Sequence, residues 1–576
     1  MDLPPSVGKS DDSKPPAPRE GPLCCCGPCA RWVRRCLPAG CLGEIKELTK
    51  LAVPLMISQF LMFLISMVST MFCGHLGKEE LDAATIANAV MSTTGYSLGV
   101  GFASATDTHV SQTFGGNNLK QIGIIMQRAL ILLFLLCFPC WALFINTENI
   151  LLLLKQDPLV SRLAGKYVLI SSPVLLEVFI FQLQMSYLQN QGITMPQIFA
   201  GIFANIINIV LHYVFLFVLH LGIPGAAYAV ICSRLALVVV LFLYIWVRKL
   251  HVTTWGGWSW ECFQEWGPLS KLAIPSILTV CFEWWIYEIG TFLAGLISVT
   301  ELAGQSIIYQ IVVLFYMIPY SLGTAVGVRV GNALGAGDPE HAKRSTIISL
   351  LSTGVVFAID IAIIGGARKG LARVFTSDQE IIELAAHALL VYSAFHLFES
   401  IACTANGILK GIGKQKIGAI TYAIGYYVVG VPLMGSLMFV AKLGVIGLWA
   451  AMTICAAIPA ISLTVYVLRV NWKNLTEEAQ ERAGLKQKTT GELAPSYTDS
   501  LSGEDTNSAI IIHEGLQNST MSDQLPLQDM RSGSDEPKNK DFLPVKTLIL
   551  RRGLAITAPV VLLIIGILVR LLVEHN

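Results

Sequence analysis

The feature that most constrains this chain is a series of long apolar stretches, each with room for a helix that crosses a membrane. A hydrocarbon core of about 30 Å requires roughly 20 apolar residues per helical crossing. The sequence therefore predicts an all-α polytopic membrane protein with thirteen spans. These lie at residues 51–72, 84–106, 122–145, 166–188, 197–219, 224–247, 272–296, 303–327, 345–366, 383–406, 416–440, 445–468 and 553–574.

Composition supports this class. Hydrophobic residues make up 54% of the chain and charged residues only 14%, whereas soluble domains have about a quarter charged residues. The net charge of +1 favours no class of partner. The 14 cysteines are scattered without metal-ligand spacing, which predicts reduced thiols and no metal or other cofactor. The CCCGPC run at Cys24–Cys29 precedes the first span, and palmitoylation or plain thiols both fit it.

The distribution of Lys and Arg predicts the orientation. These residues are about twice as abundant in the N-terminal flank and every second loop as in the alternate loops, which places the N-terminus in the cytosol and Asn576 outside the cell. The predicted organisation is a disordered N-terminus (1–45), a first lobe of six helices (46–248), a second lobe of six (249–470), a disordered cytosolic linker (471–546) and a thirteenth helix (547–576).

An internal repeat relates the two halves. KLAVP at Lys50–Pro54 returns as KLAIP at Lys271–Pro275, and YSLG at Tyr96 returns at Tyr320. Each half holds an even number of spans, so the halves are parallel repeats about an axis along the membrane normal. That arrangement is typical of secondary transporters with a substrate site between the halves. The repeat could also serve a channel or a scaffold.

The stretch VCFEWWIYEIG at Val280–Gly290 places two carboxylates in an apolar span, where each unpaired charge costs about 2.5 to 3.5 kcal/mol on translocon scales. The matching stretch of the first half carries no charge, so these acids are not needed to build the helix. We predict a proton- and substrate-binding cavity in the second lobe, lined by Glu283, Glu288 and Glu399. Candidate substrate contacts are Trp284, Tyr287, Tyr309, Gln310, Tyr316 and His396.

Alternatives remain open for single residues of this set. The tryptophans could pack or lie at the interface, and a helix–helix hydrogen bond explains His396 equally well. Glu177 and Asp360, each alone in its span, stay unassigned.

Proton coupling follows from electrostatics. Burial disfavours a charged carboxylate and a bound cation stabilises it, so a proton and an organic cation compete for the same acid. Aromatic faces add about 0.5 to 2 kcal/mol each for a weakly hydrated cation, without demanding one shape. If only a loaded carrier changes face readily, the outcome is exchange.

Several motifs resemble the multidrug and toxin extrusion (MATE) family, especially its vertebrate members: FCGHLGKEELDA from Phe72, EWWIYE from Glu283, VRVGNALGAGD from Val328 and HLFES from His396. The resemblance covers about residues 45–475 and 545–576. It implies a V-shaped twelve-helix core with an appended thirteenth helix, which exchanges external protons for intracellular organic cations.

The resemblance also carries expectations for single residues and for location. It implies roles for Glu283, Glu288 and Glu399 in proton and substrate binding, and a thiol-sensitive position at Cys73. It further implies an apical plasma-membrane exporter of drugs, toxins and cationic metabolites. We expect the lipid bilayer, protons and small organic cations as partners, no nucleic acid, and a monomer. Vertebrate relatives commonly have YE where this chain has Tyr309-Gln310, so one family acid is an amide here.

Enzyme functions are not favoured. GYSLG at Gly95–Gly99 fits G-x-S-x-G but lies inside an apolar span, and the sequence has no HExxH and no phosphate-binding P-loop motif. The remaining rivals are a sodium-coupled exporter of the same fold, a channel, and a lipid or oligosaccharide flippase.

Overall fold

The computed structural model describes residues 41–485 and 545–575. Within these ranges all regular secondary structure is helical, which confirms the predicted class. In the described part of the chain, eleven helices are long and apolar enough to cross a membrane, or twelve if the bent pair α7 and α8 counts as one span. The N-terminal cysteines Cys24–Cys29 lie outside the described residues.

The helices follow one another in two runs that correspond to the two halves of the sequence. The first run consists of α2 (Cys41–Gly74), α3 (Lys78–Met91), the π-helical turn η1 (Ser92–Tyr96), α4 (Ser97–Gly115), α5 (Leu119–Ile145), α6 (Thr147–Leu153), α7 (Pro158–Ser171), α8 (Val174–Gln189), α9 (Met195–Tyr213), η2 (Val214–Val218) and α10 (Ile223–Val247).

The second run follows a short connection through α11 (Leu250–Thr254) and η3 (Trp260–Phe263). It consists of α12 (Trp266–Gly295), α13 (Val299–Gly335), α14 (Pro339–Arg373), α15 (Gln379–Ile412), α16 (Gln415–Tyr422), η4 (Ala423–Gly430), α17 (Val431–Gly435), η5 (Ser436–Val440), α18 (Gly444–Arg469) and α19 (Trp472–Arg482), and α20 (Val545–His575) closes the chain.

Two predicted spans differ from simple straight helices. Residues 84–106 lie in the continuous helical run of α3, η1 and α4, which is less apolar than the other spans. Residues 166–188 are divided between α7 and α8, whose axes differ by 50°. Pro173 stands at this bend, where its ring removes a backbone donor and interrupts the helix.

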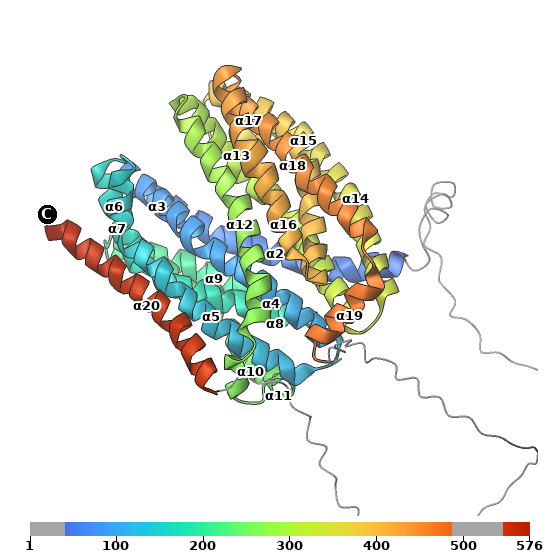
Figure 1. Ribbon diagram of the computed structural model, residues 1–576. Helices are drawn as coiled ribbons and strands as arrows, with labels where there is room; N and C mark the ends of the chain where they lie inside the picture. Colours follow the sequence, from blue (N-terminus) through green and yellow to red (C-terminus); the bar gives the residue numbers. More distant parts are fainter. Residues whose placement is uncertain (1–40, 486–544, 576) are drawn as a thin grey trace, which may run out of the picture.

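Figure 1 shows α13 to α18 gathered in one bundle and α5, α7 and α9 in another. Each bundle has buried apolar clusters of its own. The first turns of two helices cross between the bundles: Leu48 and Leu55 of α2 join the cluster of the second half, and Leu269 and Ala273 of α12 join that of the first. The two repeats therefore exchange the beginnings of their first helices.

The two lobes meet closely where α4 passes α13. A Cβ on Gly335 would lie 2.0 Å from the carbonyl oxygen of Gln112, so only glycine permits this approach. The side chain of Gln112 donates to the carbonyl of Gly411 over 2.8 Å, and Thr108 Oγ1 donates to the carbonyl of Lys410 over 2.6 Å. Backbone packing and hydrogen bonds together close this end of the molecule.

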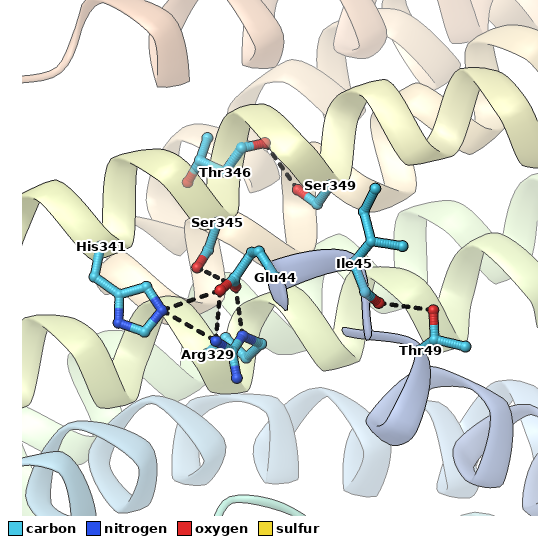
Figure 2. A network of polar contacts seen from close by, with 8 residues as sticks. All are labelled: Glu44, Ile45, Thr49, Arg329, His341, Ser345, Thr346 and Ser349. Carbon is cyan, nitrogen blue, oxygen red and sulfur yellow. Dashed lines mark hydrogen bonds and ion pairs between the residues drawn. The ribbon is translucent and has the colours of Figure 1, made fainter. Parts of the chain in front are cut away.

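Figure 2 shows a second tie between the halves, at the start of α2. Glu44 accepts hydrogen bonds from Arg329 Nε and Nη2 over 2.5 and 2.6 Å and from Ser345 Oγ over 2.5 Å. His341 Nε2 lies 3.1 Å from Glu44 Oε2. The glutamate side chain is only 3% exposed, so this ion pair is held away from water.

The helix α19 differs from the prediction of a disordered linker beginning at residue 471. Asn471 caps it by accepting hydrogen bonds from the amides of Lys473 and Asn474. Its apolar face buries Leu475 and Ala479. The prediction of a disordered linker is wrong for this first segment, because a short helix with a cap and a small apolar face forms within a polar stretch of sequence. Residues 486–544 lie outside the described part of the chain.

The helix α20 runs along α5 of the first lobe. Asn146 Nδ2 donates to the carbonyl of Gly566 over 2.9 Å, and Arg570 Nη1 donates to the carbonyl of Ile145 over 3.1 Å. Near its other end, Arg552 donates to the carbonyl of Phe263 over 2.7 Å and stacks 4.2 Å from the ring centroid of Trp266. The appended helix is thus fixed to α5 of the first lobe at one end, and to η3 and the first turn of α12 at the other.

Candidate functional site

The carboxylate of Glu283 lies at a cavity between the lobes. Glu283 is 7% exposed, and Tyr316 of α13 donates its hydroxyl to Oε1 over 3.1 Å. The cavity has a volume of about 370 Å³, its open side included, and Trp284, Tyr320 and Lys410 also line it. The cavity thus combines one carboxylate and one ammonium group with three aromatic side chains, and a few polar groups among aromatic walls are usual for a small-molecule site.

A second carboxylate, Glu399 of α15, lies deeper in the second lobe. Tyr287 Oη donates to its Oε1 over 2.6 Å, and His396 Nδ1 lies 3.1 Å from its Oε2. The other ring nitrogen of His396 lies 3.1 Å from Asp360 Oδ2. Both nitrogens can donate only in the imidazolium form, so a proton on His396 satisfies both acids at once. Glu399, His396 and Asp360 are all buried.

Tyr287 connects the two carboxylate sites. It follows Glu283 by one turn of α12, and its ring packs against Tyr309, Phe395 and Trp449 at centroid distances of 5.9, 6.4 and 6.4 Å. The predicted residue Tyr309 is therefore part of this aromatic wall. A movement of α12 would shift the Tyr287 hydroxyl relative to Glu399.

Other predicted residues lie apart from these contacts. Glu288 is partly exposed and Gln310 is exposed, and neither has a hydrogen-bond partner among the residues that the structure describes. Trp285 is 38% exposed and donates Nε1 to the carbonyl of Thr93 in the first lobe over 3.0 Å. Cys73 is fully buried, so its thiol faces no solvent in this conformation.

A larger cavity of about 600 Å³, its open side included, adjoins the Glu283 cavity. Two charged residues that we did not predict from the sequence line it. Asp107 of α4 and Lys410 of α15 both line it. Each lies just beyond a predicted span, Asp107 after 84–106 and Lys410 after 383–406. The helices α4 and α15 continue to Gly115 and Ile412, which places both charges within helices.

Asp360 also gave no local signal, because its partner His396 lies on another helix. Glu177 remains without a role, and its Oε2 has no hydrogen-bond partner in the described part of the chain. Within residues 41–485 and 545–575, no group of three His, Cys, Asp or Glu side chains is placed to hold a metal ion.

Two helical lobes of membrane-spanning helices, with a buried carboxylate at a cavity between them, define a multi-span membrane transporter. The MatE family model matches residues 54–214 and 275–434, and the chain belongs to this family. It is 47% identical to mouse multidrug and toxin extrusion protein 2 over 528 residues, which is 92% of both chains. It is 45% identical to human multidrug and toxin extrusion protein 1, over 94% of this chain and 96% of the relative.

Solved structures agree in fold. The crystal structure of the eukaryotic MATE transporter AtDTX14 matches with a TM-score of 0.74 and 31% identity, over 77% of this chain and all of that one. A Vibrio cholerae MATE transporter, VcmN, matches with a TM-score of 0.68 at 16% identity and supports the fold alone. The predicted MATE-like architecture is confirmed, and the protein is a non-enzymatic multidrug and toxin extrusion transporter.

Proposed function

We propose that this transporter exports small organic cations in exchange for protons, with Glu283 as the group for which the two compete. The observation that carries the proposal is the placement of Glu283 at a cavity walled by Trp284, Tyr316 and Tyr320. A carboxylate supplies the charge that an organic cation needs, and aromatic faces accept cations of many shapes. The names of the vertebrate relatives, multidrug and toxin extrusion proteins, support this substrate class.

The buried network behind the cavity provides a second place for a proton. Glu399 accepts a hydrogen bond from Tyr287, and Tyr287 moves with Glu283 because both belong to α12. A change in the protonation of either acid alters the contact between α12 and α15. We therefore assign Glu399, His396 and Asp360 to coupling rather than to direct contact with substrate. Among the described residues Glu288 and Gln310 make no hydrogen bond to this network, so we do not assign them to coupling.

Alternating access would open the end where the lobes now meet. The contacts of Gln112 with Gly411 and of Thr108 with Lys410 would have to separate in the opposite state. The distribution of basic residues supports a cytosolic position for this end, with Asn576 outside the cell. We propose the apical plasma membrane as the location and a monomer as the working unit, because one chain supplies both lobes and both cavities.

The ion that drives export is tested in proteoliposomes loaded with a radiolabelled monovalent cation. An imposed pH gradient is expected to drive uptake, and an imposed Na⁺ gradient is expected to leave it at the background of empty liposomes. A response to Na⁺ alone would contradict proton coupling. Uptake that neither saturates nor accelerates with unlabelled cation on the far side would indicate a channel. Scrambling of labelled lipid without cation uptake would indicate a flippase.

A further inference from the structure

The two cavities between the lobes adjoin each other and share part of their lining. Lys410, Tyr320 and Thr324 line both, together with Val100, Gly323 and Gly407. Glu283 borders only the smaller one and Asp107 only the larger one. A cation in this space therefore meets acids from both lobes and the ammonium group of Lys410.

Asp107 is held in place by hydrogen bonds from its neighbours. Three side chains of the first lobe donate to its Oδ1: Ser186 Oγ over 2.6 Å, Asn190 Nδ2 over 2.8 Å and Gln189 Nε2 over 3.2 Å. An ionised carboxylate only accepts hydrogen bonds, and this set of donors matches it. Among the described residues none donates to Oδ2, and Asp107 is only partly buried, so its second oxygen is open to the cavity.

Lys410 brings a positive charge into this space, and that charge acts on Glu283 without a direct ion pair between the two side chains in the described part of the chain. Its Nζ lies 5.8 Å from the ring centroid of Tyr320, and no carboxylate of the described chain lies within ion-pair distance of it. Its backbone is fixed by the hydrogen bond from Thr108 across the lobes. An unpaired ammonium group within a membrane protein is costly, and such groups usually serve the transport pathway.

We propose that Asp107 and Lys410 are a specificity-determining pair that sets the net charge of the cavity. This inference rests on the proposed function, since it describes how the same site chooses its substrate. Among the residues that line the two cavities, Asp107, Glu283 and Lys410 are the charged side chains. Two negative charges and one positive charge leave one net negative charge.

One net negative charge has a direct consequence for exchange. A single proton on Glu283 neutralises the cavity, and so does one bound monovalent cation. Either loaded carrier can then change face without an uncompensated charge in the membrane, whereas the empty carrier cannot. A divalent cation would leave a net positive charge. The pair therefore selects monovalent organic cations and excludes simultaneous binding of cation and proton.

The test compares uptake of tetraethylammonium, which is singly charged, with uptake of hexamethonium, which is doubly charged. Lys410→Met leaves two net negative charges and is expected to shift the uptake ratio toward hexamethonium by about tenfold, the effect of one unit charge about 10 Å away at an effective dielectric constant of about 20. Asp107→Asn leaves no net charge and is expected to lower tetraethylammonium uptake by a similar factor.

The double variant Asp107→Asn/Lys410→Met restores one net negative charge. It is expected to recover tetraethylammonium uptake to within about threefold of the native protein, which a merely structural role of either residue would not produce. Lys410→Arg keeps the charge and is expected to keep the native ratio. Lys369→Met is the matched control, because Lys369 is 48% exposed and pairs with Glu383 on the outer face.

The inference is overturned if Lys410→Met keeps the native uptake ratio, or if the double variant transports no better than Asp107→Asn. Binding of both probes to detergent-purified variants, without any gradient, gives the same comparison for a variant that binds but does not turn over. Failure of the proposed function looks different. In that case native protein shows no proton-driven uptake of tetraethylammonium, and Glu283→Gln changes nothing.

Discussion

The ion pair at the start of α2 makes a sharp prediction about stability. Glu44→Ala removes a buried carboxylate that accepts three hydrogen bonds and leaves the guanidinium of Arg329, which is 17% exposed, without its partner. Breaking a buried pair by removing one member costs about 3 to 5 kcal/mol, because the remaining charge stays buried and uncompensated. We expect a loss of this size in the free energy of unfolding.

The same helix supplies the control. Glu47 pairs with Lys50 at 2.6 Å, but their side chains are 46% and 58% exposed. An exposed pair of this kind contributes about 0 to 1 kcal/mol, so Glu47→Ala should cost little. Both variants are measured by urea unfolding in the same detergent, with tryptophan fluorescence as the signal.

A difference between the two variants of less than about 1 kcal/mol would refute the reasoning. The double variant Glu44→Ala/Arg329→Met offers an internal check. It removes the uncompensated charge as well, and should be more stable than Glu44→Ala alone. A double variant that is less stable than Glu44→Ala would mean that the guanidinium is stabilised by something other than Glu44.

Three further changes have defined outcomes. Gly335→Ala places a methyl group against the carbonyl of Gln112, so we expect the closed end of the molecule to open. An alkylating reagent should then label a cysteine introduced at that end faster than it does in the native background. Unchanged labelling would contradict the close approach. Tyr287→Phe removes the hydrogen bond to Glu399 and should slow exchange by about tenfold while leaving cation affinity within about threefold, as checked by kcat and KM. In Gly566→Leu the new side chain would collide with α5 and should release α20 from the first lobe. We expect this release as faster protease cleavage after the 486–544 segment. Cleavage at the native rate would mean that α20 accommodates the larger side chain.

Sequence reasoning succeeded where the signal is local or periodic. Membrane thickness fixes the length of an apolar run that can cross the bilayer, so the spans can be predicted from the sequence. The two lobes can be predicted because the two halves of the chain carry matching motifs. Glu283 stood out because its counterpart in the first half is uncharged. The i,i+3 spacing of His396 and Glu399 puts them on one face of a helix, and the structure brings the two side chains into contact there.

The sequence could not show which side chains on other helices contact a given acid. Asp360 meets His396 only after α14 packs on α15, and Asp107 meets its three donors only after α4 packs on α8. Lys410 looked like a loop residue because the polar end of a long helix resembles a loop in hydropathy. The helix α19 was missed for a related reason, since its short apolar face lies in a polar stretch.

The central claim, competition of proton and cation for Glu283, is tested most directly by exchange in proteoliposomes with native protein and the Glu283→Gln variant side by side. An outward-directed proton gradient should drive concentrative uptake of tetraethylammonium by the native protein. Glu283→Gln keeps the size of the side chain but can neither ionise nor release a proton, so it should show only background uptake although it is inserted and folded. Uptake by Glu283→Gln at the native rate would contradict the account.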